Sequence, residues 1–326
     1  MPTPLVSIIM PIRNEAAHLE RALDAIDAQT VPAGEIEIIV VDGGSDDDTI
    51  KIVERRMAMD SRVRLIGGAG VNTPLAMEMG RDAARAGIIA KIDGHGWINC
   101  RFLEVAIACL MREPDIGCVG GRIRPVAESV VERAISIARF SRLGVGGGIY
   151  TLAGTAQETD TVQCGVYRRA ALEDAGGFDP LLPYGEDEEV NFRVRERGWR
   201  IWFQPEMEFA YRVRSSIGTL FRQYFRYGRA RVAVVRKHPR FFRLKHALPS
   251  LLVAVLTLGF VLMPLPGGFG VGAAIWLCYL AIVGIGSVYL AVRHRFARAD
   301  LIATSIVALH SGYGLGTIRA LVSGRS

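Results

Sequence analysis

Three short apolar runs in the amino-terminal part of the chain are each followed by a cluster of polar residues. The runs are Val6–Met10, Ile36–Val41 and Ile88–Ile92, and stretches with apolar residues at helical spacing lie between them. Apolar runs of this length, bounded by chain breakers, predict parallel strands that are buried on both faces. Strands that alternate with helices predict a doubly wound α/β domain, whose ligands bind at the carboxyl ends of the strands. We therefore expect the polar clusters to lie at these ligand-binding ends.

Local signals predict where several helices begin. Ser45 is expected to cap a helix whose first turn carries Asp46–Asp48, because carboxylates are favoured at the positive end of a helix. Thr73-Pro74 predicts a further helix start, with Thr73 as the cap. Glu186–Arg197 predicts a helix with acidic residues in its first turn and arginines later. The glycine-rich segment Gly144–Gly148 predicts a mobile loop.

The last third of the chain is apolar and basic. Half of all residues are hydrophobic and the net charge is +6, yet no acidic residue lies between Glu208 and Asp300. Three apolar segments, at about 248–265, 270–292 and 300–322, have lengths close to the roughly 20 residues that cross a hydrocarbon core. The third contains His310 and Arg319, so it is either a third span packed through its glycines or a re-entrant helix.

Aromatic and cationic residues alternate between Ile217 and His246. This pattern predicts an amphipathic helix, or two helices broken at His238-Pro239, lying in a membrane interface. The loop Arg293–Arg298 is basic and the loop Pro264–Gly268 is uncharged, which places the α/β domain and the basic loop on the cytoplasmic side. An anionic membrane surface is therefore the expected partner, and nucleic acid is not, since no known nucleic-acid-binding module is visible.

These features predict three parts. Residues 1–211 would form the α/β domain, residues 212–246 the amphipathic interface helices, and residues 247–326 a membrane domain of two to three helices. Five cysteines, an odd number with no CxxC pair, indicate reduced and buried structural thiols in a cytoplasmic domain. No secretory signal peptide is expected, because the apolar run Val6–Met10 is too short for one.

Asp93 and His95 follow the strand predicted at Ile88–Ile92. A strand that carries both residues at its tip can hold a divalent cation against a diphosphate, which is the chemistry of an enzyme that uses a sugar nucleotide. Imidazole is a softer ligand than carboxylate, and this favours Mn²⁺ over Mg²⁺. In the alternative interpretation, His95 only donates a hydrogen bond to a phosphate.

Taken together, the motifs resemble the family 2 glycosyltransferases, and in particular membrane-attached bacterial enzymes of the succinoglycan glucosyltransferase type. The matching residues are Pro11-Ile12-Arg13-Asn14-Glu15, Val40–Thr49, Asp93-Gly94-His95 at the metal-binding D-x-D position, Glu186-Asp187, and Gln223-Tyr224-Phe225-Arg226-Tyr227. The resemblance covers about Val6 to Arg231 and implies the Rossmann-like GT-A fold. It further implies amphipathic interface helices and carboxyl-terminal transmembrane helices.

The resemblance also implies roles for these residues. Asp187 would be the general base of an inverting transfer, with Glu186 orienting the base or the acceptor. The nucleotide-sugar donor would be bound by Pro11, Arg13, Glu15, Asp42, Ser45 and Asp93, and the acceptor or the departing diphosphate by Gln223, Arg226 and Tyr227. Structural interpretations stand beside these roles: Asp42 as a turn former, Glu15 as a solvated acid, Glu186 and Asp187 as acids at a helix start, and Gln223, Arg226 and Tyr227 as interfacial anchors.

The implied function is that of a metal-dependent, membrane-bound hexosyltransferase of the bacterial inner membrane, with a cytoplasmic catalytic domain. It would move a sugar from a donor such as UDP-glucose to a polyprenyl-diphosphate-linked glycan in exopolysaccharide synthesis, using Mn²⁺ or Mg²⁺. One alternative is a polyprenyl-phosphate glycosyltransferase. An alternative of another class is a non-catalytic membrane scaffold that binds a nucleotide sugar. The oligomeric state is left open.

Overall fold

The computed structural model describes residues 3–144 and 154–324. The chain forms two compact units, here named the sheet unit (residues 1–125 and 149–212) and the helical unit (residues 126–148 and 213–326). The sequence predicts residues 126–148 as part of the α/β domain. The structure groups them with the helical unit instead. Of the predicted loop Gly144–Gly148, all but Gly144 lies outside the described residues.

The first half of the sheet is parallel, as predicted. Its strands lie in the order β3-β2-β1-β4, with Ile8 of β1 beside Ile38 of β2 and Ala90 of β4. Every residue of β2 and β4 is buried, which explains why these runs are continuously apolar. The strands are β1 (Val6–Ile12), β2 (Ile36–Asp42), β3 (Val63–Gly67) and β4 (Ile88–Lys91).

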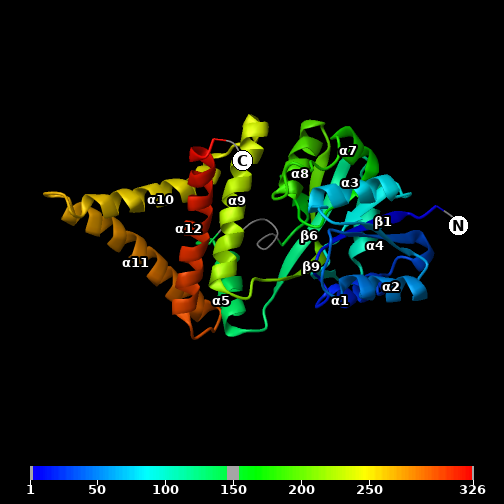
Figure 1. Ribbon diagram of the computed structural model, residues 1–326, viewed down its shortest axis with the longest axis horizontal. Helices are drawn as coiled ribbons and strands as arrows, with labels where there is room; N and C mark the ends of the chain where they lie inside the picture. Colours follow the sequence, from blue (N-terminus) through cyan, green and yellow to red (C-terminus); the bar gives the residue numbers. More distant parts are fainter. Residues whose placement is uncertain (1–2, 145–153, 325–326) are drawn as a thin grey trace. The chain divides into compact units, whose positions relative to one another are not determined.

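Helices cover both faces of this half-sheet. Figure 1 shows α1 and α2 on one face and α3 on the other, which is the doubly wound arrangement expected from the sequence. The helices are α1 (Leu19–Asp27), α2 (Thr49–Met59) and α3 (Thr73–Ala83), and the 3-10 turn η1 (Ala33–Glu35) precedes β2.

Two of the predicted helix caps are wrong. The α2 helix begins at Thr49 with Asp48 at its cap position, because the hydroxyl of Ser45 is already bonded to the carboxylate of Asp42. The α3 helix is capped one residue before the prediction, by Asn72, whose side chain accepts a hydrogen bond from the backbone N–H of Leu75.

The second half of the sheet is antiparallel and continues the order as β8-β6-β9-β5, with β7 also paired to β9. Strand β8 runs antiparallel to both β4 and β6, and β5 and β7 run antiparallel to β9. The elements are β5 (Gly96–Ile98), α4 (Phe102–Arg112), β6 (Ile116–Val126), β7 (Gln157–Glu158), β8 (Val166–Arg168), α7 (Arg169–Asp174), α8 (Glu186–Glu196) and β9 (Arg200–Arg212). The helix predicted at Glu186–Arg197 is confirmed by α8.

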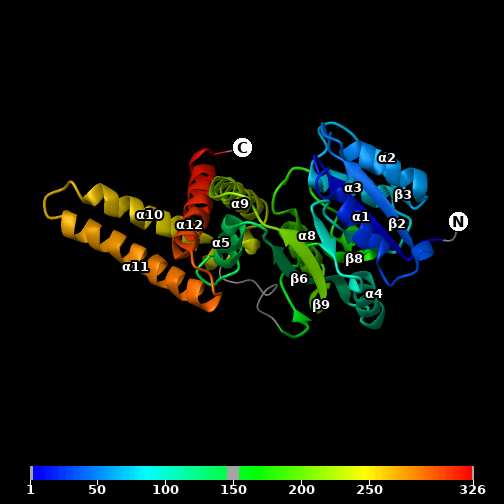
Figure 2. The same ribbon diagram turned by 90° about the horizontal axis from the view of Figure 1, so that it is seen from below.

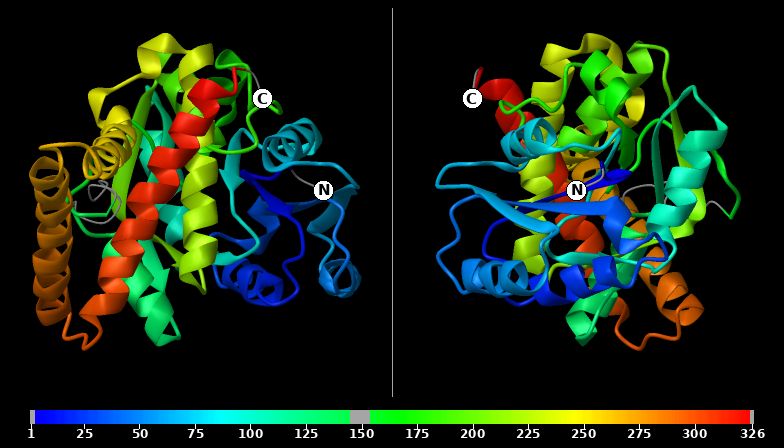
Figure 3. Two further views of the ribbon diagram at one scale, coloured as in Figure 1. Left: turned by 60° about the vertical axis from the view of Figure 1, so that its left-hand side comes forward. Right: turned by 90° about the vertical axis from the view of Figure 1, so that its right-hand side faces the viewer.

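The helical unit contains α5 (Val130–Arg139), α9 (Ile217–Lys237), the 3-10 turn η2 (Pro239–Phe241), α10 (Leu244–Leu262), α11 (Phe269–Arg293) and α12 (Ala299–Val322). The break predicted at His238-Pro239 is confirmed. By length and composition, α10, α11 and α12 are each able to cross a membrane. Figures 1 and 3 show α9 and α12 side by side, and Figure 2 shows α10 and α11 as a hairpin.

The five cysteines are all free, but only three of them are buried. Cys109, Cys118 and Cys164 are buried, whereas Cys100 and Cys278 are exposed. The prediction of five buried thiols is therefore wrong for the last two. Cys100 follows the edge strand β5, and Cys278 lies on the outer surface of α11, where an apolar surrounding would suit a thiol as well as a protein core does.

Candidate active site

A buried lysine joins the carboxyl end of β4 to the start of α8. Lys91 is the last residue of β4 and is 1% exposed. Its Nζ donates hydrogen bonds to Asp187 Oδ1 at 2.7 Å and to Glu186 Oε1 at 2.9 Å, and lies 3.9 Å from Asp93 Oδ1. Gly185, in the left-handed conformation with φ 77, turns the chain into α8 and so directs Glu186 and Asp187 at this amine.

The three carboxylates and the amine determine one another's protonation. Burial raises the pKa of Asp187 to about 7, against the opposing effect of the nearby Lys91 ammonium. Burial alone would lower the pKa of Lys91, but the charges of Asp187, Glu186 and Asp93 outweigh it and raise that pKa well above its ordinary value. Burial also opposes the charge of Asp93, yet Lys91 and His95 keep the pKa of Asp93 below its ordinary value. Lys91 thus stays cationic, and Asp187 titrates near neutrality.

His95 pairs with Glu15 across the ends of β4 and β1. The His95 Nδ1 lies 3.0 Å from Glu15 Oε1, and the ring meets Tyr211 of β9 edge-on with 6.1 Å between centroids. Burial disfavours the imidazolium, but the Glu15 hydrogen bond and the Asp93 charge prevail and raise the pKa of His95 to about 9. Gly94 permits the close approach, because a Cβ there would lie 2.8 Å from Ile12 Cγ2.

The loops after β1 and β2 are bonded to each other. The backbone N–H of Asn14 donates to Ser45 Oγ at 2.9 Å, and the N–H of Asp46 donates back to Asn14 Oδ1 at 2.9 Å. The N–H of Glu15 donates to Thr49 Oγ1 at 2.8 Å. These bonds hold Asn14 in the left-handed region with φ 57, a conformation that asparagine tolerates better than most residues.

Asp42 forms the turn that its alternative interpretation describes. Its carboxylate accepts hydrogen bonds from the N–H of Gly44 at 2.8 Å and from the Ser45 hydroxyl at 2.6 Å. Of the other predicted donor-binding residues, Pro11 lies in β1 beside Val41 of β2. Arg13 is exposed in the following loop.

The remaining predicted residues lie on α9 of the helical unit. The side-chain N–H of Gln223 donates to the Tyr227 hydroxyl at 2.9 Å, one helical turn away. Gln223 is buried and Arg226 is exposed, so the motif does not present its three side chains to one environment.

Asp93 and His95 form an incomplete set of metal ligands. In the described part of the chain, no three His, Cys, Asp or Glu side chains are grouped so that they could hold a metal ion. The Asp93 carboxylate fits a cation that takes its other ligands from a diphosphate. His95 can join it as a ligand only after its ring has lost a proton, because an imidazolium has no lone pair to give to a metal. Asp93 keeps 24% of its side chain exposed, so it can reach a bound ligand.

Sequence reasoning missed Lys91. A cation inside an otherwise apolar strand was the available signal, since a lysine is almost never fully buried unless it is paired. Its partners could not be found from the sequence, because Asp187 is 96 residues away. Cys164 was missed in the same way; its Sγ lies 3.8 Å from Asp93 Oδ2, and its own backbone has a φ of 49.

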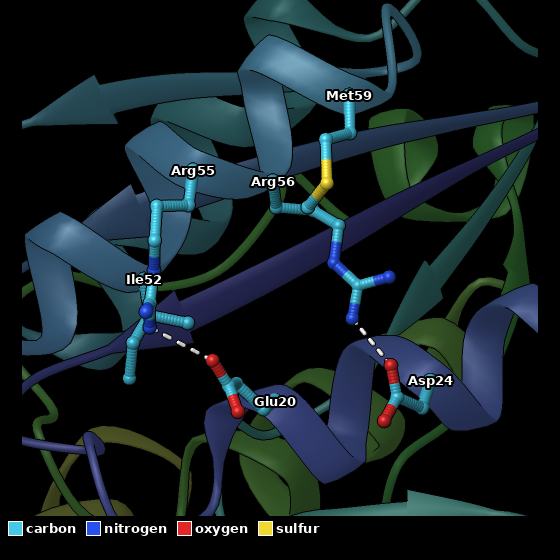
Figure 4. A pocket seen from close by; sticks show the side chains of 6 residues that line it. All are labelled: Glu20, Asp24, Ile52, Arg55, Arg56 and Met59. Carbon is cyan, nitrogen blue, oxygen red and sulfur yellow. Dashed lines mark hydrogen bonds and ion pairs between the residues drawn. The ribbon is translucent and has the colours of Figure 1, made fainter.

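A cavity elsewhere in the sheet unit contains none of these residues. Figure 4 shows the cavity between α1 and α2, lined by Glu20, Asp24, Ile52, Arg55, Arg56 and Met59. Arg55 pairs with Glu20 at 2.8 Å, and Arg56 pairs with Asp24. Surface ion pairs of this kind explain the lining as a contact between two helices.

Comparison with known proteins identifies the family. Residues 7–176 match the model of glycosyl transferase family 2. The chain belongs to this family. The succinoglycan biosynthesis protein ExoA of Rhizobium meliloti is 29% identical over 98% of this chain and 95% of its own length. A dolichyl N-acetyl-alpha-D-glucosaminyl phosphate 3-beta-D-2,3-diacetamido-2,3-dideoxy-beta-D-glucuronosyltransferase of Methanococcus voltae is 23% identical over 98% of both chains.

The fold agrees with the family. The mannosyltransferase PcManGT from Pyrobaculum calidifontis, solved with GDP-Man and Mn²⁺, superposes with a TM-score of 0.65 and 20% identity, covering 100% of this chain and 89% of its own. GalNAc-T7, solved with UDP, GalNAc and Mn²⁺, has a TM-score of 0.55 over 72% of this chain. The GT-A fold predicted from the sequence is confirmed.

Proposed function

We propose that this family 2 glycosyltransferase moves a hexose from a nucleotide-diphosphate sugar, such as UDP-glucose, to a polyprenyl-diphosphate-linked glycan at the cytoplasmic face of a bacterial inner membrane. Three apolar helices support membrane attachment. The succinoglycan relative supports a role in exopolysaccharide synthesis, and the dolichyl phosphate in the name of the archaeal relative supports a lipid-linked acceptor. The GDP-Man complex of PcManGT supports a nucleotide-sugar donor.

The observation that carries the mechanism is the largely buried Asp187, held by Lys91 at 2.7 Å. In the proposed inverting step, the acceptor hydroxyl oxygen attacks the anomeric carbon and its proton passes to the Asp187 carboxylate. The bond from that carbon to the diphosphate oxygen breaks, and the nucleoside diphosphate leaves with the electron pair. Glu186, bonded to the same amine at 2.9 Å, would orient the base or the acceptor.

The other site residues are assigned to binding. Pro11, Arg13, Glu15, Asp42 and Ser45 would line the nucleotide, since all five belong to the ends of β1 and β2 or the loops that follow. Gln223, Arg226 and Tyr227 of α9 would contact the acceptor or the departing diphosphate. Asp93 and His95 would hold Mn²⁺ or Mg²⁺, which neutralises charge on the diphosphate when it is bound.

The replacement Asp187→Asn tests the base. The amide keeps the shape of the side chain and cannot accept the proton, so turnover should fall about 10² to 10⁴-fold while donor binding is kept. Glu188→Gln, on the same turn of α8, is the matched control and should stay near wild type. Sugar transfer would be followed by nucleotide release and by the mass of the lipid product, with UDP-, GDP- and dTDP-sugars offered to a polyprenyl-lipid extract.

The outcomes separate the alternatives. Turnover of Asp187→Asn above about a tenth of wild type would show that Asp187 is not the base. A product on polyprenyl phosphate itself would identify the other acceptor class. No nucleotide release from wild type with any donor would support the non-catalytic scaffold. Full activity in excess chelator would show that transfer needs no divalent cation. The replacement His95→Asp should shift the metal preference from Mn²⁺ towards Mg²⁺.

A further inference from the structure

The three apolar helices of the helical unit do not have the same surroundings. In α12, 50% of the most apolar stretch is buried inside the protein, compared with 11% in α10 and 22% in α11. Large apolar side chains are exposed along α10 and α11, among them Leu251, Leu258, Leu280 and Ile285. Exposed apolar surface of this extent suits lipid. Half of this stretch of α12 is instead covered by other parts of the protein.

The carboxyl-terminal half of α12 packs against α9, backbone to backbone. A Cβ on Gly316 would lie 2.1 Å from the carbonyl oxygen of Phe225, and a Cβ on Gly312 would lie 2.7 Å from that of Phe221. On the other side of the contact, Gly228 faces the carbonyl oxygen of Tyr313 in the same way, at 2.2 Å. Small residues at these positions let two helices touch along their axes.

Side chains of α9 extend this contact. Arg231 donates a hydrogen bond to the Tyr313 hydroxyl at 3.1 Å, and Arg236 donates to the carbonyl oxygen of Ala320 at 2.9 Å. The second bond satisfies one of the last carbonyl groups of α12, which have no partner within the helix itself. Together with the glycine contacts, these bonds make α9 and α12 a single packed body.

The amino-terminal half of α12 packs against α5. Ile302, Ile306 and Leu309 are buried in this half of α12, and α5 buries Ala134, Ile135 and Ala138 together with Glu132 and Arg139. In the middle of α12, His310 Nε2 lies 2.8 Å from the carbonyl oxygen of Leu143, which follows α5. The whole length of α12 is therefore tied to α5 and α9.

A transbilayer α12 would take charged helices into the hydrocarbon core with it. The α9 helix carries six cations in its 21 residues: Arg222, Arg226, Arg229, Arg231, Arg236 and Lys237. Charged side chains at the centre of a bilayer are strongly disfavoured unless they face a polar interior, and Arg222, Arg226 and Arg229 are exposed. The same helix at the level of the lipid head groups would place these cations beside phosphates.

The α10–α11 hairpin has the dimensions of a membrane crossing. Its helices have 19 and 25 residues, or about 28 and 37 Å at 1.5 Å per residue, against a hydrocarbon core of about 30 Å. Figure 1 shows α9 and α12 running across the direction of α10, while α11 slants back from the hairpin loop to the start of α12. A hairpin along the membrane normal therefore leaves α9 and α12 close to the membrane plane.

We infer that only α10 and α11 cross the membrane, and that α12 lies with α5 and α9 in the head-group layer of one leaflet. The surface presented to the lipid is cationic, so the lipid it fits is anionic. The carboxyl-terminal Ser323 then lies on the same side of the membrane as the loop Arg293–Arg298. A third crossing would put it on the side of the loop Pro264–Gly268.

Single accessible cysteines in the full-length protein test the sidedness, with the three buried thiols left in place. The background carries Cys100→Ser and Cys278→Ser, which removes the two exposed thiols. Ser323→Cys, Ala297→Cys and Pro266→Cys are then each treated with a membrane-impermeant maleimide in intact spheroplasts and in inside-out vesicles. Ser323→Cys should be labelled in the same one of these two preparations as Ala297→Cys. It should be protected in the preparation in which Pro266→Cys is labelled. Labelling of Ser323→Cys together with Pro266→Cys would overturn the inference.

Depth in the bilayer separates an interfacial α12 from a re-entrant one, which would give the same sidedness. Val307 and Leu315 are exposed on α12, and Leu280 is exposed near the middle of α11. Nitroxide labels at Val307→Cys and Leu315→Cys should both be accessible to a water-soluble nickel chelate, and a label at Leu280→Cys should be accessible only to oxygen. A deep signal from either α12 position would refute the inference. Neither readout depends on transferase activity. Both experiments therefore test the position of α12 independently of the proposed function.

Discussion

Lys91 is the residue on which the candidate site depends most. It is fully buried, and its amine is the common partner of Glu186 and Asp187. A buried charge without a partner is much less stable than a buried pair, because the penalty for removing it from water is no longer compensated. The amine therefore stabilises two carboxylates of which only 16% of each side chain is exposed.

Replacing this amine should destabilise the protein severely. We expect Lys91→Met to lower the free energy of unfolding by about 3 to 5 kcal/mol, since two largely buried carboxylates lose their partner. The loss should be smaller at acidic pH, where Asp187 is protonated. Lys51→Met is the matched control: Lys51 pairs with Asp48 at the surface with 77% of its side chain exposed, and it should change stability by less than about 0.5 kcal/mol. Denaturant unfolding of both variants in detergent would measure the difference; equal effects would contradict this account of Lys91.

The protonation of Asp187 predicts a pH dependence. Burial raises the pKa of Asp187 to about 7, and a general base must be ionised to accept a proton. We therefore expect kcat/KM, which reports the free enzyme, to rise with pH through a limb near 7 and to level off above it. The same shift acts on stability in the opposite direction. Asp187 stabilises the fold most below about pH 4, and this contribution is lost as the pH rises towards 7.

A pH–rate profile from pH 5 to 9 is the measurement. The residual activity of Asp187→Asn should lack the acidic limb, whereas Glu188→Gln should retain it. A limb that persists unchanged in Asp187→Asn would assign the titration to another group.

At the residue scale, the sequence predicted which acids would gather but not what holds them together. Asp93, Glu186 and Asp187 were predicted as site residues from local patterns, and the structure brings all three around one amine. The role of Lys91 cannot be predicted from the sequence, because only the fold brings its partners on α8 close to it. Asp42 shows the converse: its local turn geometry is readable from Asp42-Gly43-Gly44-Ser45, and the structure contains that turn.

At the scale of elements, predictions succeeded where periodicity was strong. The continuous apolar runs became β1, β2 and β4 because both faces of these strands are covered. Strand β9 was not predicted, since its buried and part-exposed residues alternate irregularly along 13 residues. The packing partners of α12 were also beyond the sequence, because α5 and α9 are distant from it along the chain.

The close contact between α9 and α12 predicts that one added methyl group at Gly316 will destabilise the protein. A Cβ on Gly316 has no room beside the backbone of Phe225, so we expect Gly316→Ala to destabilise the helical unit by about 1 to 3 kcal/mol. At Gly284 of α11 nothing lies within 4 Å of an added Cβ, so Gly284→Ala should be neutral or stabilising by up to about 1 kcal/mol. Thermal unfolding in detergent compares the two; a tolerated Gly316→Ala would show that the helices are not in close contact.

At the scale of the whole molecule, charge is distributed unevenly along the chain. The net charge is +6, while residues 209–299 contain no acidic side chain at all. Cations in that region therefore have no carboxylate of their own segment to pair with, and for those exposed on α9, such as Arg222 and Arg229, lipid phosphate would supply a counter-charge. Each Lys or Arg near an anionic surface contributes about 1 kcal/mol.

Anionic lipid should accordingly stabilise the reconstituted protein. We expect the unfolding temperature to rise with the fraction of anionic lipid in vesicles, and the rise to shrink in high salt. The double replacement of Arg222 and Arg229, both exposed on α9, by glutamine should reduce this response. Arg55→Gln in the sheet unit, which breaks a surface pair with Glu20, should leave it unchanged. An equal response of all three proteins would contradict a lipid-facing α9.

The excursion of residues 126–148 into the helical unit has a consequence for biosynthesis. The α5 helix packs against α12 but leaves the ribosome much earlier. The α12 helix begins at Ala299, about 160 residues after α5 ends at Arg139. At a synthesis rate of about 5 to 20 residues per second, α5 waits roughly 8 to 30 s for this partner. During that interval the sheet unit can fold around an unfinished insertion. We expect contact with the membrane or with a chaperone to shield α5 until the last helix has been made.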